Sequence, residues 1–207
     1  MSGGAAAGAC WRFGDDPGEV AAALARGAVL AIPTESSYGL AVDPRDAAGV
    51  ARIFRLKGRP DGRPLPVVGA DAAAFGRLGV APDAPALLWA ARHWPAALSV
   101  VVAIAAPIPA SAGGHTLAVR VPGHAALRAL AAALGGPLTA TSANPSGAPP
   151  YLDPEPLAAW LARAGEASGV ETLLVDGGRL PGGPPSTLVE LVEGRPVVLR
   201  PGRFEIV

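Results

Sequence analysis

Cysteine, lysine and histidine are scarce in this chain of 207 residues. A single cysteine, Cys10, excludes an intramolecular disulfide and a zinc site built from cysteines, and it fits a reducing compartment. The histidines His93, His115 and His124 show neither an HExxH pattern nor another paired metal-ligand spacing. The composition therefore gives no indication of a metal centre held by protein side chains.

Charge is also sparse, and it is balanced. Charged residues make up 16% of the chain, and 17 acidic residues match 17 basic ones. Domains that mainly grip nucleic acid are usually clearly basic, so this balance argues against such a role. No apolar run reaches the ~18 residues that span a bilayer. Residues 1–10 carry neither the basic nor the apolar region of a signal peptide. We therefore expect a cytoplasmic protein with no membrane association.

Several well-known catalytic motifs are missing as well. The chain has no GxxxxGK[ST], no GxGxxG after a strand and no GxSxG. A P-loop nucleoside triphosphatase, the usual dinucleotide-binding fold and the α/β-hydrolase triad are therefore disfavoured. Any chemistry is expected to depend on charge and positioning rather than on a covalent nucleophile.

Helical patterns alternate with short apolar segments along the chain, half of whose residues are apolar. Asp16 precedes Pro17 and Glu19 as a helix N-cap would, which predicts a helix ending at Gly27. Asp43 is predicted to cap a second helix, which runs to about residue 56. Strands are predicted at 28–32, 38–42, 65–68, 98–104, 116–121, 138–141, 172–175, 187–192 and 196–200, and further helices at Asp71, Asp83, 123–134 and 154–164.

This alternation predicts a layered α/β fold. The last two strands form a hairpin, so the sheet is expected to be mixed rather than purely parallel. Residues 14–207 are expected to form a single domain, preceded by a disordered Gly/Ala-rich leader over residues 1–13.

Lys57 is the sole lysine of the chain, and it lies close to Arg59 and Arg63. An ammonium is a compact point charge and a guanidinium is a planar fork, so the two are not interchangeable at an exacting site. Taken alone, Lys57 is slightly better explained as a solvated loop lysine. Its neighbours favour a functional role.

Polar residues collect in four segments: 33–40, the loop that begins at Lys57, 139–147 and 176–187. Loops at strand ends are where α/β proteins place ligand sites. Any one of these segments is explained by ordinary turn formation. Together, their hydroxyls, glycine-rich backbone and cations favour a site for a polyanion such as a phosphorylated ligand.

Read in order, these motifs resemble the YrdC/TsaC family from about Gly14 to Val207. The matching segments are Pro33–Leu40, Lys57-x-Arg59-Pro60 with Pro64-Leu65, Val119–Pro122, Ser142-Ala143-Asn144-x-Ser146-Gly147, Ser186-Thr187 and Leu199–Gly202. The resemblance implies a YrdC-like twisted mixed sheet flanked by helices, with one large, positively lined cavity. It also implies a nucleotidyltransferase that makes L-threonylcarbamoyl-AMP and pyrophosphate from L-threonine, bicarbonate and ATP.

The resemblance also implies roles for individual residues. Lys57 and Arg59 are the expected catalytic residues, because an anionic N-carboxylate must approach the anionic α-phosphate. The implied ATP-binding residues are Lys57, Arg59, Arg63, Thr116, Ser142, Asn144 and Arg200. The implied threonine-binding residues are Thr34, Tyr38, Arg120 and Ser186. Arg120 would clamp the carboxylate of the amino acid, whereas Tyr38 could equally belong to the core.

The cofactor implied by the resemblance is Mg²⁺, which would arrive with ATP and needs no dedicated metal ligands. The product is expected to pass to proteins that transfer the threonylcarbamoyl group to tRNA, with at most a weak contact to tRNA itself. The chain departs from the usual family pattern at Ser36, Val68, Pro95–Ser99 and Pro150. These positions bear on the geometry of the pocket and on its amino-acid selectivity.

Three alternatives to this function remain. One is a related enzyme that adenylates a carbamoyl group. The second is a non-catalytic YrdC-like protein that binds RNA or assists ribosome assembly, against which the zero net charge counts. The third is an enzyme similar to 3,4-dihydroxybutanone phosphate synthase, whose acidic metal-binding loop we do not find.

Overall fold

The computed structural model describes residues 10–12, 14–58 and 62–206. Its strands are β1 (Cys10–Arg12), β2 (Val29–Pro33), β3 (Tyr38–Ala41), β4 (Val67–Val68), β5 (Leu98–Ala103), β6 (Thr116–Arg120), β7 (Leu138–Thr139), β8 (Thr141–Ser142), β9 (Thr172–Asp176), β10 (Thr187–Val192) and β11 (Arg195–Arg200). Its helices are α1 (Pro17–Arg26), α2 (Ala47–Lys57), α3 (Pro85–Ala91), α4 (Ala125–Ala133) and α5 (Pro154–Ser168), with 3-10 helices η1 (Ala73–Leu78) and η2 (Pro109–Ser111). Within these described ranges, no helix has the length and apolar character needed to cross a membrane.

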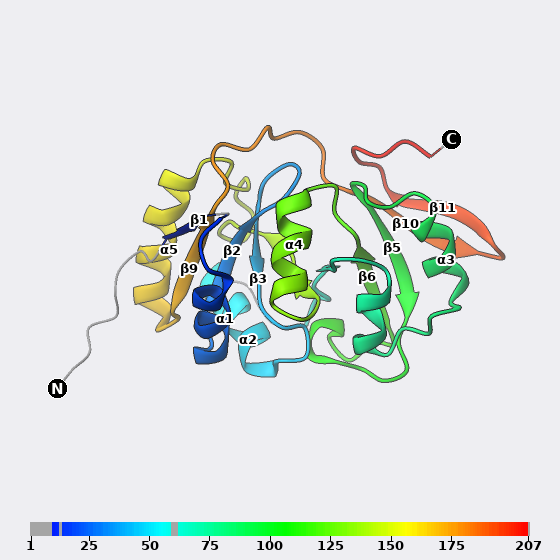
Figure 1. The fold of residues 1–207 in the computed structure, drawn as a ribbon, viewed down its shortest axis with the longest axis horizontal. Coiled ribbons are helices and arrows are strands. Elements are labelled where there is room, and N and C mark those ends of the chain that lie inside the picture. Colours follow the sequence, from blue (N-terminus) through cyan, green and yellow to red (C-terminus); the bar gives the residue numbers. More distant parts are fainter. Residues whose placement is uncertain (1–9, 13, 59–61, 207) are drawn as a thin grey trace.

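The strands form two mixed sheets rather than the single sheet predicted. One sheet has the order β1-β9-β2-β3-β8, and the other has the order β11-β10-β5-β6-β4-β7. Figure 1 shows the first sheet at the end of the molecule that carries α1 and α5, and the second at the end that carries α3. Each sheet combines parallel pairs, such as β2 with β9 and β5 with β10, with antiparallel ones. The α/β class predicted from the sequence is confirmed.

The two sheets meet at β7 and β8, which only Ala140 separates. The hydroxyl of Thr139 in β7 accepts a hydrogen bond from the Val42 N–H at 3.0 Å and donates to the Leu40 carbonyl at 3.3 Å. The Ala140 N–H donates to the carbonyl of Pro66, just before β4, at 2.8 Å. This seam places the ends of strands from both sheets side by side.

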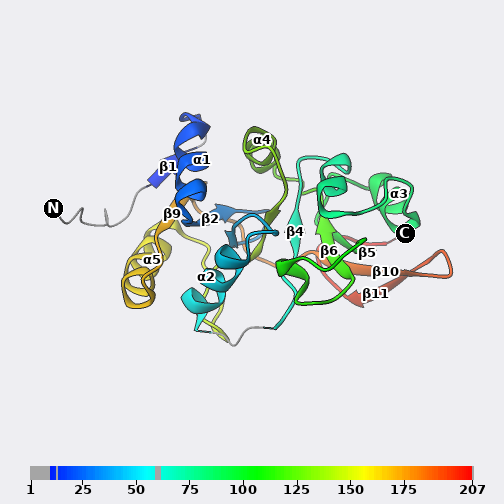
Figure 2. The same cartoon turned by 90° about the horizontal axis from the view of Figure 1, so that it is seen from below.

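Alternate residues of β2 face two different apolar cores. Val29 and Ala31 belong to the larger core with residues of α2 and α5, whereas Leu30 and Ile32 pack with residues of α1 and α4. Figure 2 accordingly shows α1 on one face of the first sheet and α2 and α5 on the other. A strand buried on both faces reads as a continuous apolar run, which is the pattern of this segment.

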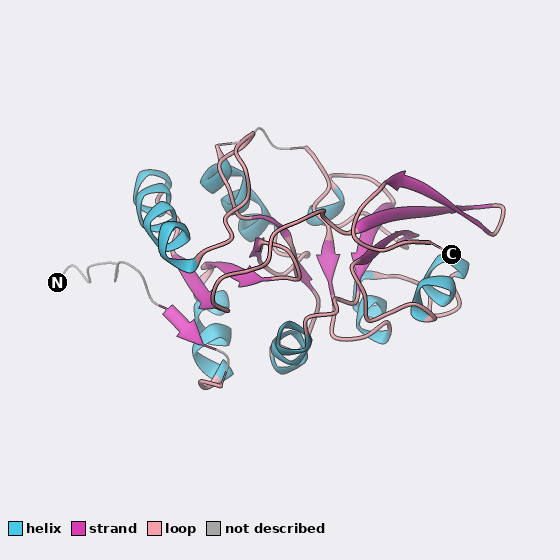
Figure 3. Ribbon diagram, turned by 90° about the horizontal axis from the view of Figure 1, so that it is seen from above, coloured by secondary structure: helices cyan, strands magenta, loops and turns pink. Residues whose placement is uncertain are grey.

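The hairpin of β10 and β11 projects from the end of the second sheet (Figure 3). All six residues of β11 are exposed. Val192, Val197, Val198 and Leu199 are among the exposed large apolar residues of the described chain. The predicted hairpin is confirmed, and its turn contains Glu193 at φ 51° and Gly194 at φ 76°.

Local capping decides where the helices begin. The Asp16 side chain accepts from the Gly18 N–H and Gly27 ends α1 at φ 91°, so this predicted helix is confirmed. The prediction that Asp43 caps α2 is wrong. Asp46 accepts from the Ala48 N–H, while Asp43 binds Arg45 instead. Both aspartates suit an N-cap, and the sequence alone did not rank them.

Two further expectations differ from the structure. Part of the predicted leader, Cys10–Arg12, forms strand β1, which pairs in parallel with β9. Trp11 is buried there, and its indole N–H donates to the Asp16 carbonyl. Burial of this side chain favours the strand over disorder; residues 1–9 and 13 lie outside the described ranges. The strand predicted over residues 138–141 is divided between β7 and β8.

Candidate functional site

A cavity of about 850 Å³ lies where the two sheets meet. Its walls come from the β2–β3 loop, β4, β6, the β7–β8 junction, residues 149–152, the segment before β10, and β11. Described residues of all four polar segments noted in the sequence lie at this cavity or beside it. Both sheets therefore contribute to a single site.

The lining of the cavity suits an anionic, hydrogen-bonding ligand. Five of the lining residues are serines: Ser36, Ser37, Ser99, Ser142 and Ser186. The cationic lining residues are Arg120 and Arg200, and none of the lining residues in the described part of the chain is Asp or Glu. Hydroxyl and guanidinium groups with no opposing carboxylate are the groups that bind phosphates and carboxylates.

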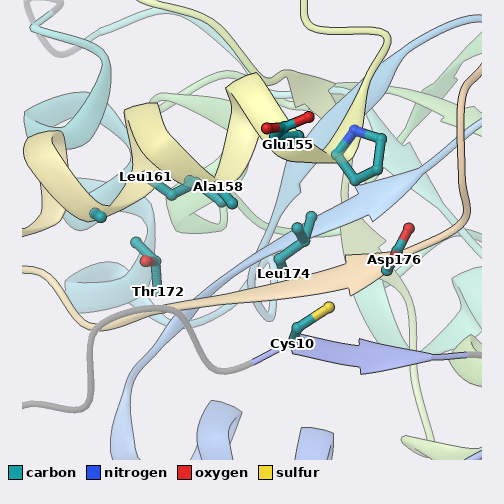
Figure 4. A pocket seen from close by; sticks show the side chains of 9 residues that line it. Cys10, Glu155, Ala158, Leu161, Thr172, Leu174 and Asp176 are labelled. Atoms are coloured by element: carbon teal, nitrogen blue, oxygen red, sulfur yellow. The ribbon is translucent and has the colours of Figure 1, made fainter.

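A second cavity, of about 240 Å³, lies beside α5 and β9 (Figure 4). Its titratable lining residues are Cys10, Glu155 and Asp176, and Figure 4 shows them around the apolar side chains of Leu161 and Leu174. Burial, with a smaller contribution from Asp176, raises the pKa of the Cys10 thiol. Acidic groups without a lining cation do not suit an anion, so the larger cavity is the candidate site.

Arg120, at the end of β6, is held by Glu35 from the β2–β3 loop. The Nη1 of Arg120 donates to Glu35 Oε2 at 2.8 Å, and the side chains are only 11% and 14% exposed. The other carboxylate oxygen accepts from the Gly123 N–H at 2.8 Å. Burial lowers the pKa of Arg120 from its ordinary value, and nearby Arg200 adds to this, while Glu35 opposes it. A guanidinium has five N–H donors, so Arg120 retains donors for a ligand.

Arg200, at the end of β11, contacts Ser186. Its Nη2 donates to the Ser186 carbonyl at 2.8 Å and to the Ser186 hydroxyl at 3.3 Å. The Ser186 hydroxyl is also 2.9 Å from the hydroxyl of Ser99, a buried residue of β5. Two guanidiniums and two hydroxyls thus line one side of the cavity.

Lys57 is the last residue of α2, and its side chain is buried, so the alternative of a solvated loop lysine is wrong. Its Nζ donates to the carbonyls of Ser142 and Asn144 and, at 2.8 Å, to Asn144 Oδ1. The same Oδ1 accepts from the Ser142 hydroxyl at 2.6 Å, and the Asn144 amide donates to the Ala148 carbonyl. The ammonium and Asn144 therefore hold the turn that presents Ser142 to the cavity.

Thr34 and Tyr38 also line the cavity. The Thr34 hydroxyl donates to the Ser37 carbonyl at 2.7 Å and closes the β2–β3 turn. The Tyr38 side chain is fully buried; its hydroxyl donates to the Gly178 carbonyl and accepts from the Gly177 N–H. Tyr38 therefore belongs to the core, as the sequence allowed, and it fastens the start of the segment before β10.

Among the predicted site residues that the structure describes, those that do not line the cavity are Thr116, Arg63, Lys57 and Asn144. Thr116 is exposed at the start of β6, at the opposite end of the strand from Arg120 and thus about 13 Å away along it. Arg63 is exposed beside Pro64, which does line the cavity. Arg59 lies outside the described residues.

Sequence reasoning gave no role to Glu35, Ser99 or Arg203, which the structure places at or beside the cavity. A serine within the apolar run of β5 was a usable signal for Ser99. Glu35 and Arg120 are 85 residues apart, so only the fold pairs them.

The fold and the site define an α/β protein whose cavity is built for anionic ligands. The chain belongs to the Sua5/YciO/YrdC family, described as "Telomere recombination", which matches residues 22–202. The resemblance drawn from the motifs is therefore confirmed.

Individual relatives agree with this membership. The threonylcarbamoyl-AMP synthase of Thiobacillus denitrificans is 37% identical over 191 residues, covering 89% of this chain and 95% of that protein. The threonylcarbamoyl-AMP synthase of Bacillus subtilis is 37% identical over 188 residues, covering 89% of this chain and 52% of that protein. The structure of P. abyssi Sua5 complexed with L-threonine matches with a TM-score of 0.75 and 32% identity, covering 94% of this chain and 57% of that one. This chain thus spans nearly all of the first relative and just over half of the other two.

Proposed function

We propose that this chain is an L-threonylcarbamoyl-AMP synthase. In this reaction the threonine amine combines with bicarbonate to give an N-carboxylate and water. A carboxylate oxygen then attacks the α-phosphorus of ATP, and pyrophosphate leaves. The observation that carries the proposal is that Thr34, Arg120, Ser142, Ser186 and Arg200, from five separate segments, line one cavity. Relatives that bear this name cover most of the chain.

The central physical problem of the reaction is repulsion between two anions. The N-carboxylate and the triphosphate approach each other only where fixed cations offset their charges, and such cations are most effective away from bulk water. Arg120 is held in place by Glu35 and Arg200 by Ser186, so both charges are positioned before a ligand binds. This preorganisation supports an arrangement with the substrate carboxylate at Arg120 and phosphates toward Arg200.

Lys57 would act from beneath the turn that carries Ser142. Three oxygens already accept hydrogen bonds from its ammonium, so a phosphate oxygen would have to replace one of them. We propose that this exchange couples ATP binding to the position of Ser142. Asn144 then serves to orient the turn, since its amide oxygen and its amide nitrogen both form hydrogen bonds within it. Arg59 and Arg63 remain proposed contacts of the triphosphate.

Threonine would be bound at the side of the cavity made by Thr34, Arg120 and Ser186. Thr116, at the far end of its strand, is not part of this proposal. Tyr38 is proposed to act through the glycines that it binds rather than by direct contact.

Mg²⁺ is proposed to enter with ATP. The described residues contain no group of three or more His, Cys, Asp or Glu side chains placed to hold a metal ion. The serine hydroxyls of the cavity fit an ion that keeps several waters and is held by the triphosphate. When bound, the ion would neutralise phosphate charge. The product is proposed to pass to proteins that transfer the threonylcarbamoyl group to tRNA, and a cytoplasmic location stays a prediction.

The test is pyrophosphate release from ATP in bicarbonate buffer with Mg²⁺, with and without L-threonine. Release should depend on threonine, and Lys57→Ala should lower kcat about 100-fold, as expected for loss of a fixed charge in a catalytic site. Lys57→Arg should restore little, because a planar fork cannot direct its donors at three oxygens around one point. Arg163→Ala, which removes an exposed cation from α5, serves as the control. Wild-type protein that releases no pyrophosphate with threonine would refute the proposal, and release with carbamoyl phosphate instead would favour the carbamoyl-adenylating alternative.

A further inference from the structure

Arg203 lies three residues after Arg200, the last residue of β11. It joins the β2–β3 loop to the segment before β10 at the rim of the cavity. Its Nη2 donates to the Gly182 carbonyl at 2.7 Å, and its Nη1 donates to the Glu35 carbonyl at 3.3 Å. Next to this bridge, the Gly182 N–H donates to the Ser36 carbonyl at 2.9 Å. One guanidinium thus ties the segment before β10 to the β2–β3 loop.

The loop held by Arg203 is also the loop that holds Arg120. The backbone carbonyl of Glu35 accepts from Arg203, and its carboxylate accepts from Arg120 and from the Gly123 N–H. Any shift of the loop backbone would therefore move the carboxylate that orients Arg120.

The segment before β10 is fastened at the same place. It crosses from β9 in one sheet to β10 in the other (Figure 1). The Arg203 N–H donates to the Pro185 carbonyl at 2.9 Å, next to Ser186. Gly183 leaves room for the guanidinium, since a Cβ at that position would lie 2.9 Å from Arg203 Nη2. The backbone at Arg203 therefore supports Ser186, whereas its guanidinium supports the Glu35 loop and the segment at Gly182.

We propose that Arg203 is a positioning residue that fixes the amino-acid side of the cavity. This inference rests on the proposed function, because it takes threonine as the ligand of Thr34, Arg120 and Ser186. All three of these residues lie on, or are bonded to, segments that Arg203 ties together. Ser142 and the Lys57 ammonium, which we assign to the nucleotide side, are instead held by the turn at Asn144. Loss of Arg203 should therefore weaken threonine binding selectively.

The first test is steady-state kinetics of pyrophosphate release by the full chain. Arg203→Ala should raise KM for L-threonine about fivefold, the effect expected for losing charge-assisted hydrogen bonds at a partly exposed site, and should change kcat and KM for ATP less than about twofold. Arg203→Lys should give an intermediate KM, because an ammonium can reach one of the two carbonyls. Arg179→Ala is the matched control. It removes an exposed ion pair with Asp153 from the same segment, outside the bridge, and should leave KM for threonine unchanged.

The second test does not depend on turnover. Amide hydrogen exchange of Gly182 should accelerate about fivefold in Arg203→Ala and stay unchanged in Arg179→Ala. Only Arg203→Ala removes the contacts that hold the Gly182–Ser36 hydrogen bond closed. Unchanged exchange, or equal rises in the KM values for threonine and ATP, would overturn the inference while leaving the synthase function in place. Wild-type protein without threonine-dependent release would overturn the function and with it the assignment of threonine to Arg203, even if exchange at Gly182 responds as expected.

Discussion

Replacing Gly202 by alanine should destabilise the protein and distort the site. A Cβ at this position would lie 2.3 Å from the Pro185 carbonyl oxygen and 2.5 Å from both Ser186 C and Thr187 N. These are backbone atoms, which cannot rotate away as a side chain can. An ordinary contact needs about 3.4 Å or more, so the two chain segments would have to separate by roughly 1 Å.

That separation would strain three hydrogen bonds. The Arg203 N–H donates to the Pro185 carbonyl at 2.9 Å, the Phe204 N–H donates to the Thr187 hydroxyl at 3.1 Å, and the same hydroxyl donates to the Phe204 carbonyl at 2.6 Å. Each is worth about 1 kcal/mol, and overpacking of this kind typically costs about 1–3 kcal/mol by itself. Because the losses overlap, we expect a decrease of about 3 kcal/mol in the free energy of unfolding.

The assay is thermal and denaturant unfolding of the wild type, Gly202→Ala and the control Gly76→Ala. A loss of about 3 kcal/mol corresponds to a Tm lower by about 6–12 °C in a chain of this size. Gly76 lies in η1 with no atom within 4 Å of its Cβ position, so Gly76→Ala should be neutral or slightly stabilising. KM for threonine should also rise in Gly202→Ala, because Ser186 is displaced. A Tm for Gly202→Ala within about 2 °C of the wild type would refute the reasoning.

Three further predictions concern single side chains. Tyr38→Phe should lower the free energy of unfolding by about 1 kcal/mol in denaturant titrations, because two glycine backbone groups lose a hydrogen-bond partner. No loss would show that water replaces the hydroxyl. Burial lowers the pKa of His124 from 6.5, so the folded state disfavours its protonation and stability should fall as the pH drops below about 6.5. The stability advantage of the wild type over His124→Asn should therefore be larger at pH 8 than at pH 5, and a constant difference would contradict this. Thr116→Val should leave KM for ATP within about twofold of the wild type. Ser142→Ala should raise KM for ATP about fivefold, because a lost hydrogen bond to a charged group has an effect of that order. The opposite ranking of the two variants would return Thr116 to the nucleotide site.

Much of the fold was predictable because local signals agreed with each other. In α1, the cap at Asp16 and the left-handed Gly27 bound the helix on both sides. For α2 the local signals were ambiguous, and the choice between Asp43 and Asp46 was decided when Arg45 engaged Asp43. The division into two sheets depends on pairings between distant segments, such as β1 with β9, which no local pattern encodes.

The candidate site was predictable in composition but not in detail. The polar segments do gather at one cavity, as hydroxyls and cations at strand ends indicated. The sequence could not show that Lys57 closes a helix and is buried against the turn at Asn144. It also could not show that Glu35 and Arg203 stand behind the groups facing the cavity, because their contacts join residues up to 168 positions apart.

The seam at Thr139 and Ala140 has a consequence for how ligands reach the cavity. Ala140 alone separates β7 of one sheet from β8 of the other. The Thr139 hydroxyl accepts a hydrogen bond from the Val42 N–H and donates one to the Leu40 carbonyl, at the end of β3. The two sheets therefore cannot separate by a hinge motion without breaking the hydrogen bonds of this seam. We therefore expect substrates to enter and products to leave past the loops at the rim, and we expect movement of those loops, rather than of the sheets, to limit ligand exchange.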